Sequence, residues 1–385
     1  MQNIQVLNNI SPLGLEKFPK DSYKVSTSND NPDAILVRSA KMHDMEIEKS
    51  LKAVGRAGAG VNNIPLQKMS DNGVVVFNTP GANANAVKEL VISSMLLASR
   101  NICQGWRYVN DLPLDNLKAT VEDGKKQYSG SELPGKTLGI VGLGAIGVEI
   151  ANAASTLGMD VIGYDPSISK KNAWKISSDV EEALSLEELF SKSDFVSFHV
   201  PLVDATKNLL NAKRIALLPN GCVVINMSRD GIVDEDELLK ALDSGSVKYY
   251  VTDFPIDEKK DHDRVIALPH LGASTSEAEE NCAMMIVKQI KDYLENGNIV
   301  NSVNFPDAKM PRAGMERLSI THRNIPNMVR QITRAIAEEE ANIVDMLNKS
   351  RGELAYTLID IEDEISEFVI KNIEQVEGIL KVRVL

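Results

Sequence analysis

The stretch "GIVGLGAIGVEIANAAS" constrains the fold more than any other part of the chain. Gly142, Gly144 and Gly147 form a GxGxxG pattern between a short apolar run and a run with helical spacing. In such a unit the first glycine permits a tight turn, the second lets a pyrophosphate approach the backbone, and the third allows close helix packing. Asp165 ends the next apolar run, where a carboxylate accepts hydrogen bonds from ribose hydroxyls and repels a 2′-phosphate. The pattern predicts a Rossmann-type domain that binds NAD rather than NADP; the alternative is a structural glycine turn beside a capping aspartate.

Short apolar runs alternate with helical patterns from the start of the chain to about residue 275, which predicts crossover units and parallel sheets. Two long stretches with helical spacing, 84–100 and 275–295, are expected to bridge the first two domains. A polar connector of 111–135 separates the two alternating regions, and "GNIVNSVNFP" is typical of a linker. The chain is therefore expected to hold at least two α/β domains.

After Pro311 the pattern changes to a βαββαβ order. This order is that of the split ferredoxin-like unit, in which two helices cover one face of an antiparallel sheet. The expected elements, in chain order, are strand 318–322, helix 326–339, strand 342–348, strand 353–361, helix 365–372 and strand 379–384.

Charge and cysteine content exclude several classes of protein. Lys and Arg number 42 against 54 Asp and Glu, so the net charge of −12 opposes binding to nucleic acid or anionic membranes. The three cysteines, Cys103, Cys222 and Cys282, lack the spacing of a disulfide or metal framework, so no metal is expected. No export signal or membrane span is visible, which predicts a cytoplasmic protein.

Three charged residues match the needs of a dehydrogenase that acts on a 2-hydroxy acid. Arg229 follows an apolar run, and its guanidinium suits a substrate carboxylate. His270 ends another run, where α/β proteins bind ligands, and can take the hydroxyl proton. Glu258 could hold the histidine ring and raise its pKa. Taken singly, each residue has an alternative interpretation. Arg229 could be a surface cation, Glu258 one of many acids in an acidic loop, and His270 a loop histidine.

Several long motifs occur in an order that resembles the D-isomer-specific 2-hydroxyacid dehydrogenases. They span most of residues 55–275 and read "RAGAGVNN", "NTPGANANAVKEL", "GKTLGIVGLGAIG", "GYDP", "FHVPL", "INMSRDGIVDEDEL" and "LPHLGAST". The resemblance implies a Rossmann-type NAD domain, 98–287, inserted in a split flavodoxin-like substrate domain formed by 1–97 and 288–310. It also implies the roles proposed for Arg229, Glu258 and His270.

The same resemblance implies further ligand contacts. For the cofactor these are Gly142, Gly144, Ala145, Ile146, Gly147, Asp165, His199, Val200, Pro201 and Asp253. For a phosphorylated small-molecule substrate they are Arg56, Ala57, Gly58, Asn78 and Thr79. Two departures stand out: Asp230 replaces a usual glycine, and "DFPIDE" leaves Asp257 as a second candidate for the role of Glu258.

Residues 315–385 resemble an ACT domain, a small amino-acid-sensing module. The resemblance implies an effector site with His322, Asn324 and Asn342, the last from across a dimer of modules, and L-serine as its ligand. Asn327 stands where a glycine is common, and asparagine tolerates the left-handed backbone such a turn requires. The alternative is a module that only joins subunits into a dimer or tetramer.

Two other functions remain open from the sequence. One is a hydroxypyruvate or glyoxylate reductase without a phosphate site. The other is an NAD-responsive regulatory protein that has lost turnover.

Overall fold

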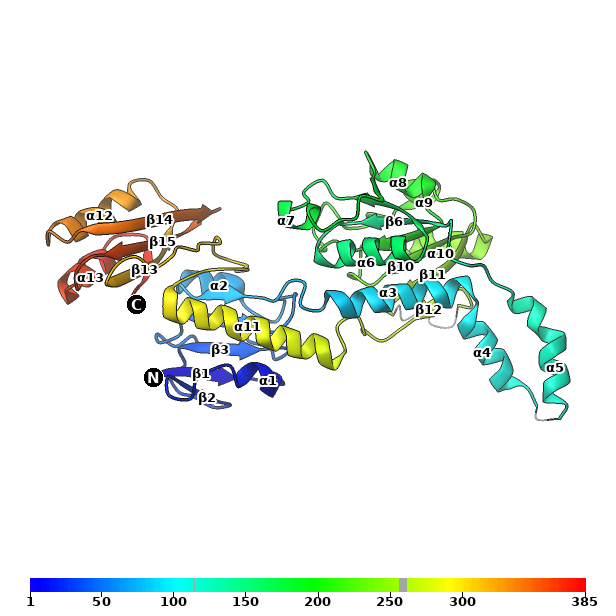
Figure 1. The fold of residues 1–385 in the computed structure, drawn as a ribbon, viewed down its shortest axis with the longest axis horizontal. Coiled ribbons are helices and arrows are strands. Elements are labelled where there is room, and N and C mark those ends of the chain that lie inside the picture. The colour runs from blue at the N-terminus through cyan, green and yellow to red at the C-terminus, as the bar shows by residue number, and fades with distance from the viewer. Residues whose placement is uncertain (114, 256–261) are drawn as a thin grey trace. The chain divides into compact units, whose positions relative to one another are not determined.

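The computed structural model describes residues 1–113, 115–255 and 262–385. By compactness the chain forms two units, Met1–Ala82 with Glu279–Leu385, and Asn83–Ala278 (Figure 1). The unit boundaries fall directly before helix α3 (Ala84–Ser99) and near the start of helix α11 (Ser276–Asn296), so both predicted long helices are confirmed. The domain boundaries at 97/98, 287/288 and 315 stay predictions.

The first unit contains a parallel five-stranded sheet with the order β2-β1-β3-β4-β5. Its strands are β1 (Gln2–Val6), β2 (Tyr23–Ser26), β3 (Ala34–Val37), β4 (Ala53–Arg56) and β5 (Val75–Phe77). Helix α11 packs on one face of this sheet, and α2 (Leu66–Asp71) packs on the other; α1 (Pro12–Leu15) is a short turn. Because both faces are covered, β3 (AILV) and β5 (VVF) are continuous buried apolar runs rather than alternating ones.

The C-terminal residues of this unit form an antiparallel sheet with the order β14-β15-β13-β16. Its elements are β13 (Glu316–Arg323), α12 (Met328–Ala337), β14 (Ile343–Arg351), β15 (Leu354–Ile361), α13 (Glu367–Glu374) and β16 (Ile379–Val384). Both helices pack on one face, so the expected βαββαβ arrangement is confirmed. We call residues 313–385 the C-terminal module.

The other face of the module's sheet packs against helix α11 and the residues that follow it. The rings of Tyr293 and Tyr356 lie 6.5 Å apart, and the Tyr356 hydroxyl donates a hydrogen bond to the carbonyl of Gly297 (2.6 Å). The Arg383 guanidinium lies 4.5 Å from the centre of the Tyr293 ring. The module therefore shares a hydrophobic core with the five-stranded sheet.

Arg317 joins the module to the chain segment that leads into it. Its side chain is fully buried and pairs with the equally buried Asp360 at 2.5 and 2.7 Å. The remaining guanidinium hydrogens go to the carbonyls of Asn296, Met310 and Pro311 at 2.8–3.0 Å. All five donors of the guanidinium are thus used. We call this group of bonds the Arg317 clamp.

The second unit is built on a parallel seven-stranded sheet with the order β12-β11-β10-β9-β6-β7-β8. The strands are β6 (Thr137–Val141), β7 (Asp160–Tyr164), β8 (Val180–Glu182), β9 (Phe195–Phe198), β10 (Cys222–Asn226), β11 (Val247–Thr252) and β12 (Val265–Ala267). The direction of winding reverses at β6, between β7 and β9. A ligand crevice is expected beyond the carboxyl ends of the strands at such a switch point.

Helices cover both faces of this sheet. Helices α3 and α6 (Ala145–Thr156) pack on one face. The other face carries α8 (Leu186–Lys192), α9 (Ala212–Ile215) and α10 (Glu235–Ser244), and α7 (Lys170–Ala173) is one short turn. The predicted Rossmann-type α/β architecture is confirmed.

The connector expected over 111–135 is more ordered than its polar sequence indicates. It contains α5 (Leu117–Gly124) and the 3-10 turn η1 (Lys125–Tyr128), and it follows α4 (Ile102–Asp111). The Tyr108 and Tyr128 rings pack 5.1 Å apart, and the Tyr108 hydroxyl donates to the Thr120 carbonyl. These tertiary contacts hold short segments that are weakly helical alone.

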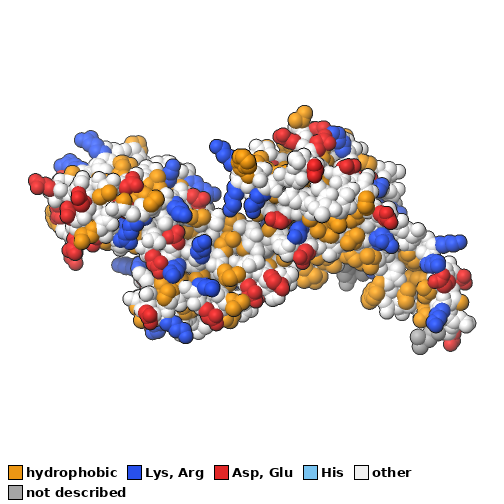
Figure 2. All heavy atoms as spheres, viewed as in Figure 1, with side chains coloured by type: hydrophobic (Ala, Val, Ile, Leu, Met, Phe, Trp, Pro, Cys, Tyr) orange, Lys and Arg blue, Asp and Glu red, His pale blue; other side chains and the backbone are white. Residues whose placement is uncertain are grey.

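On the face in Figure 2, Lys and Arg side chains alternate with Asp and Glu, and no continuous basic surface is visible. No helix among the described residues is long and apolar enough to cross a membrane. Within the same residues, no group of three or more His, Cys, Asp or Glu side chains has the geometry to hold a metal ion.

Candidate functional site

The glycine loop after β6 has the geometry that dinucleotide binding requires. Gly142 adopts φ +97°, which other residues rarely tolerate, and a Cβ there would lie 2.6 Å from the His199 carbonyl oxygen. A Cβ on Gly147 would lie 2.0 Å from the Gly142 carbonyl oxygen, so helix α6 packs closely on the loop. A Cβ on Gly144 would meet nothing within 4 Å, which leaves open space beside the start of α6. The geometry at each glycine is consistent with its expected role in binding a dinucleotide, which stays a prediction.

Ala145 and Ile146 are the first two residues of α6, after Gly144 as its N-cap. No side chain caps this end of the helix. Its free N–H groups and the positive end of the helix dipole therefore face the open space beside Gly144 and suit a phosphate group.

Asp165 follows β7 directly, at the same edge of the sheet. Its Oδ2 accepts a hydrogen bond from the backbone N–H of Leu143 (2.9 Å), and its Oδ1 accepts one from the N–H of Ser167 (2.9 Å). These bonds attach the carboxylate to the glycine loop and fix its direction. Each oxygen keeps lone-pair capacity for a diol.

Two buried polar atoms lie beyond the ends of β9 and β11 without a partner among the residues described. They are Nδ1 of His199 and Oδ1 of Asp253. Nε2 of His199 is bonded to the Ser197 hydroxyl (2.8 Å), and Oδ2 of Asp253 accepts from the Gly272 N–H (3.0 Å). Burial lowers the pKa of His199 to about 3 and raises the pKa of Asp253. Such orphaned groups cost free energy unless a ligand bonds them.

Val200 and Pro201 continue the segment that faces the glycine loop. A Cβ on Gly142 would lie 2.8 Å from a side-chain carbon of Val200. The Val200 carbonyl accepts a hydrogen bond from the Ser228 hydroxyl (2.6 Å), which ties this segment to the end of β10. Pro201 is exposed.

Arg229 lies in a turn that Asn226 organises. Asn226 is buried at the end of β10, donates to the Arg229 carbonyl (2.9 Å) and accepts from the Ser228 N–H (3.2 Å). The half-buried Arg229 guanidinium donates to the Ser228 carbonyl (2.6 Å). Sequence reasoning missed Asn226 and Ser228 as positioning residues, although both stand in "INMSR".

His270 follows β12 with its side chain exposed, and the ring of Phe254 lies 4.8 Å from its ring between centroids, tilted by 57°. The Phe254 N–H donates to the Thr252 hydroxyl (3.1 Å), which holds the backbone of Phe254 at the end of β11. Phe254 is a third positioning residue that the sequence did not reveal. Glu258 and Asp257 lie outside the described residues.

The predicted substrate loop belongs to the first unit. Arg56 ends β4 and donates through Nε to the Arg38 carbonyl (3.1 Å). Gly58 adopts φ +146°, and a Cβ there would lie 1.6 Å from Nη1 of Arg56, so only glycine lets the guanidinium fold over the loop.

Asn78 and Thr79 follow β5 and join the same loop. The Asn78 amide donates to the Ala59 carbonyl (2.7 Å), and the Thr79 N–H donates to the Gly58 carbonyl (3.1 Å). Ala57 is buried between them and the sheet. The structure therefore brings together all five predicted residues of this loop.

The three predicted effector residues are bonded inside the C-terminal module. His322 is buried, and its ring nitrogens contact the Arg323 carbonyl and the Thr357 hydroxyl. Asn324 donates to the Gly352 carbonyl (2.9 Å), and Asn342 donates to Glu362 (2.7 Å).

The turn before helix α12 has the expected backbone. Asn327 adopts φ +70°, as predicted, and α12 begins at Met328 rather than at Pro326. The left-handed residue ends the turn and therefore delays the start of the helix.

In the second unit, the glycine loop, the open helix N-terminus, Asp165 and the two orphaned polar atoms meet at one edge of the sheet. This arrangement fits NAD and defines the unit as the cofactor domain of a dinucleotide-dependent dehydrogenase.

Comparison with known proteins narrows this class. Residues 92–272 match the family "D-isomer specific 2-hydroxyacid dehydrogenase, NAD binding domain". The D-3-phosphoglycerate dehydrogenase of Haemophilus influenzae is 34% identical over 89% of this chain and 83% of its own length. The enzyme of the same name from Methanocaldococcus jannaschii is 35% identical over 86% of this chain and 62% of its own length.

A solved structure of an enzyme with a related name is also similar to this chain. NAD⁺-bound 3-phosphoglycerate dehydrogenase of Entamoeba histolytica is 28% identical and superposes with a TM-score of 0.62 over 79% of this chain and 98% of that one. The chain belongs to the NAD-dependent D-isomer-specific 2-hydroxyacid dehydrogenases, and its cofactor is NAD.

Proposed function

We propose that the protein oxidises D-3-phosphoglycerate to 3-phosphohydroxypyruvate with NAD, the first step of L-serine biosynthesis. The observation that carries this proposal is the relationship to D-3-phosphoglycerate dehydrogenases over 86–89% of the chain. An exposed histidine and an ordered arginine at the cofactor edge support the same chemistry.

The bound cofactor would lie along Gly142–Gly147 and Asp165, with its polar groups meeting His199 and Asp253, and it supplies the hydride acceptor. Arg229 holds the substrate carboxylate, because its guanidinium presents paired donors to two oxygens. His270 removes the hydroxyl proton through an imidazole nitrogen as the C2 hydrogen leaves. In the reverse direction the imidazolium returns this proton to the carbonyl oxygen.

Glu258 is proposed to hold the His270 ring, with Asp257 as the alternative. Arg56 is proposed to bind the phosphate of the substrate. Support comes from the loop of Gly58, Asn78 and Thr79, which orders the backbone around it. The five-stranded sheet order supports a flavodoxin-like substrate domain.

The test is NADH formation from D-3-phosphoglycerate and NAD, with trapping of the keto product. Arg56→Ala is expected to lower kcat/KM for D-3-phosphoglycerate by at least about tenfold, a loss of about 1.4 kcal/mol. D-Glycerate, which lacks the phosphate, is the matched control substrate and should lose little.

Equal losses on both substrates would favour a hydroxypyruvate or glyoxylate reductase. No turnover of any 2-hydroxy acid would leave the non-catalytic, NAD-responsive protein.

We further propose that the C-terminal module is an ACT domain that assembles the cytoplasmic protein into a dimer or tetramer and binds L-serine. Its βαββαβ fold and the exposed edge strand β14, with Val344 and Met346 facing solvent, support pairing between modules. Serine binding requires His322, Asn324 or Asn342 to exchange present bonds for ligand bonds. Serine inhibition of NADH formation, lost in Asn342→Ala, is the expected result; inhibition that persists in this variant would overturn the site.

A further inference from the structure

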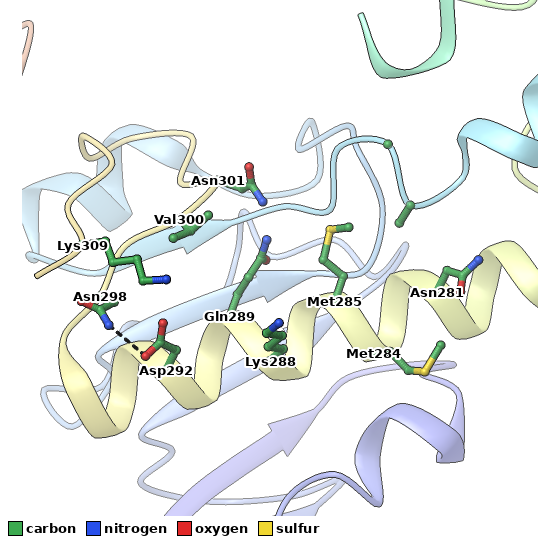
Figure 3. Close-up of a pocket in the computed structure, with 12 residues that line it drawn as sticks. Asn281, Met284, Met285, Lys288, Gln289, Asp292, Asn298, Val300, Asn301 and Lys309 are labelled. Carbon is green, nitrogen blue, oxygen red and sulfur yellow. Dashed lines mark hydrogen bonds between the residues drawn. The ribbon is translucent and has the colours of Figure 1, made fainter. Parts of the chain in front are cut away.

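A pocket of about 630 Å³ lies in the first unit, and none of the residues assigned above to the cofactor, the substrate or the effector lines it. One wall is the face of helix α11 that carries Met285, Lys288, Gln289 and Asp292. The opposite wall is the loop with Val300 and Lys309 (Figure 3). The volume suits a small metabolite.

Gln289 has unsatisfied bonding capacity in this pocket. Its side chain is 8% exposed, and neither its amide nitrogen nor its amide oxygen has a hydrogen-bond partner among the described residues. Figure 3 shows it extending from α11 toward Val300 and Asn301. A buried amide that can both donate and accept fits a ligand that carries an acceptor and a donor close together.

Charged groups of both signs flank this amide. Lys288 and Lys309 line the pocket, and the ammonium group of neither forms a hydrogen bond or ion pair with any residue that the structure describes. Asp292 receives the Asn296 and Asn298 amides on Oδ1 at 2.9 and 3.0 Å, which leaves Oδ2 to accept from a ligand. The pocket therefore offers cations for a carboxylate and a carboxylate oxygen for an ammonium group.

The remaining wall is apolar and adaptable. Met284, Met285, Val300 and Ala82 contribute it, and methionine side chains adjust readily to the shape of a ligand. Rotation of Met285 beside Gln289 would give a ligand access to the amide. The wall suits a short aliphatic group.

We propose that this pocket binds a small zwitterionic α-amino acid. The ligand carboxylate is held by the lysines and the Gln289 amide nitrogen, the ammonium by Asp292 and the Gln289 amide oxygen, and the side chain by the methionines. Because Gly81 and Ala82 also line the pocket, an occupant touches the last residues before the unit boundary at Asn83. The inference does not rest on the proposed reaction.

The test is isothermal titration calorimetry on the full chain with three probes of similar size. L-Alanine carries both charges, propionate only the carboxylate, and ethylamine only the ammonium group. We expect L-alanine to bind at least tenfold more tightly than either single-charge probe. Equal binding of propionate would overturn the zwitterion assignment, and no binding of L-alanine would overturn the site.

Matched variants locate the binding. Gln289→Leu and Lys309→Met should each weaken L-alanine binding at least tenfold, while Lys291→Met, on the same helix but outside the pocket, should not. Urea midpoints at or above the wild-type value for all variants would show that the fold is retained. Unchanged L-alanine affinity in both pocket variants would place the ligand elsewhere, for example in the C-terminal module, and would refute the proposal.

Discussion

Two alanine substitutions in the glycine loop are expected to have different effects. Gly144→Ala should weaken NAD binding, whereas Gly147→Ala should lower stability. At Gly144, φ −70° and ψ −167° are accessible to alanine, and the added methyl meets no protein atom within 4 Å. Replacing glycine at this N-cap by alanine costs at most about 1 kcal/mol. The methyl does occupy the space where the phosphates approach the N–H groups of α6. Loss of one charge-assisted hydrogen bond, about 1.5–3 kcal/mol, weakens NAD binding by about 10- to 150-fold.

Gly147→Ala acts on the fold instead. Its methyl would lie 2.0 Å from the Gly142 carbonyl oxygen, so the loop and α6 must separate, at about 1–3 kcal/mol of stability. Calorimetric titration with NAD and urea unfolding are the two assays. Gly105→Ala in helix α4, whose methyl would make only ordinary contact at 3.9 Å, is the control for both. A stable Gly144→Ala variant with unchanged NAD affinity would refute the reasoning.

Four further outcomes are expected. His270→Asn should lower kcat by about 10²-fold or more with a smaller change in KM in steady-state assays, and unchanged kcat would exclude His270 as the base. Arg317→Met leaves Asp360 buried without its partner and should cost about 3–5 kcal/mol in urea unfolding of the first unit; a loss below 1 kcal/mol would contradict the clamp. Because burial lowers the folded-state pKa of His199 to about 3, the unfolded chain binds its proton first on acidification. The free energy of unfolding should therefore fall as the pH drops below about 6.5, by up to about 1.4 kcal/mol per pH unit. In the His199→Gln variant, the part of this pH dependence that His199 contributes between about pH 5 and 6.5 should be absent. Gln289→Leu removes an unsatisfied buried amide and should leave stability unchanged or raise it by up to about 1–3 kcal/mol in the absence of ligand; a clear loss would indicate a structural role.

The elements with strong local signals were predictable from the sequence. The positive φ at Gly142 and the close approach of α6 to the loop at Gly147 both require glycine, so the residue type itself indicates them. The long helix α11 and the βαββαβ order follow from hydrophobic periodicity. The left-handed turn at Asn327 follows from the tolerance of asparagine for positive φ.

Features that depend on partners distant in sequence were not predictable. Phe254 lies against the His270 ring through a contact between two segments that only the folded sheet brings together. Helix α5 is stabilised by tertiary contacts rather than by its own propensity. The pair of Arg317 and Asp360 joins residues 43 positions apart, and nothing in either local pattern marks it.

The Arg317 clamp affects how experiments with a truncated chain are to be interpreted. Three of its acceptors are the carbonyl oxygens of the last residue of α11 and of two residues between α11 and β13, so the C-terminal module carries the donors that satisfy them. A chain ending before residue 313 would lose these donors and uncover Tyr293 on α11. Activity lost on such truncation would reflect damage to the five-stranded half of the first unit. Point variants in the module, rather than its removal, are therefore the informative way to separate sensing from catalysis.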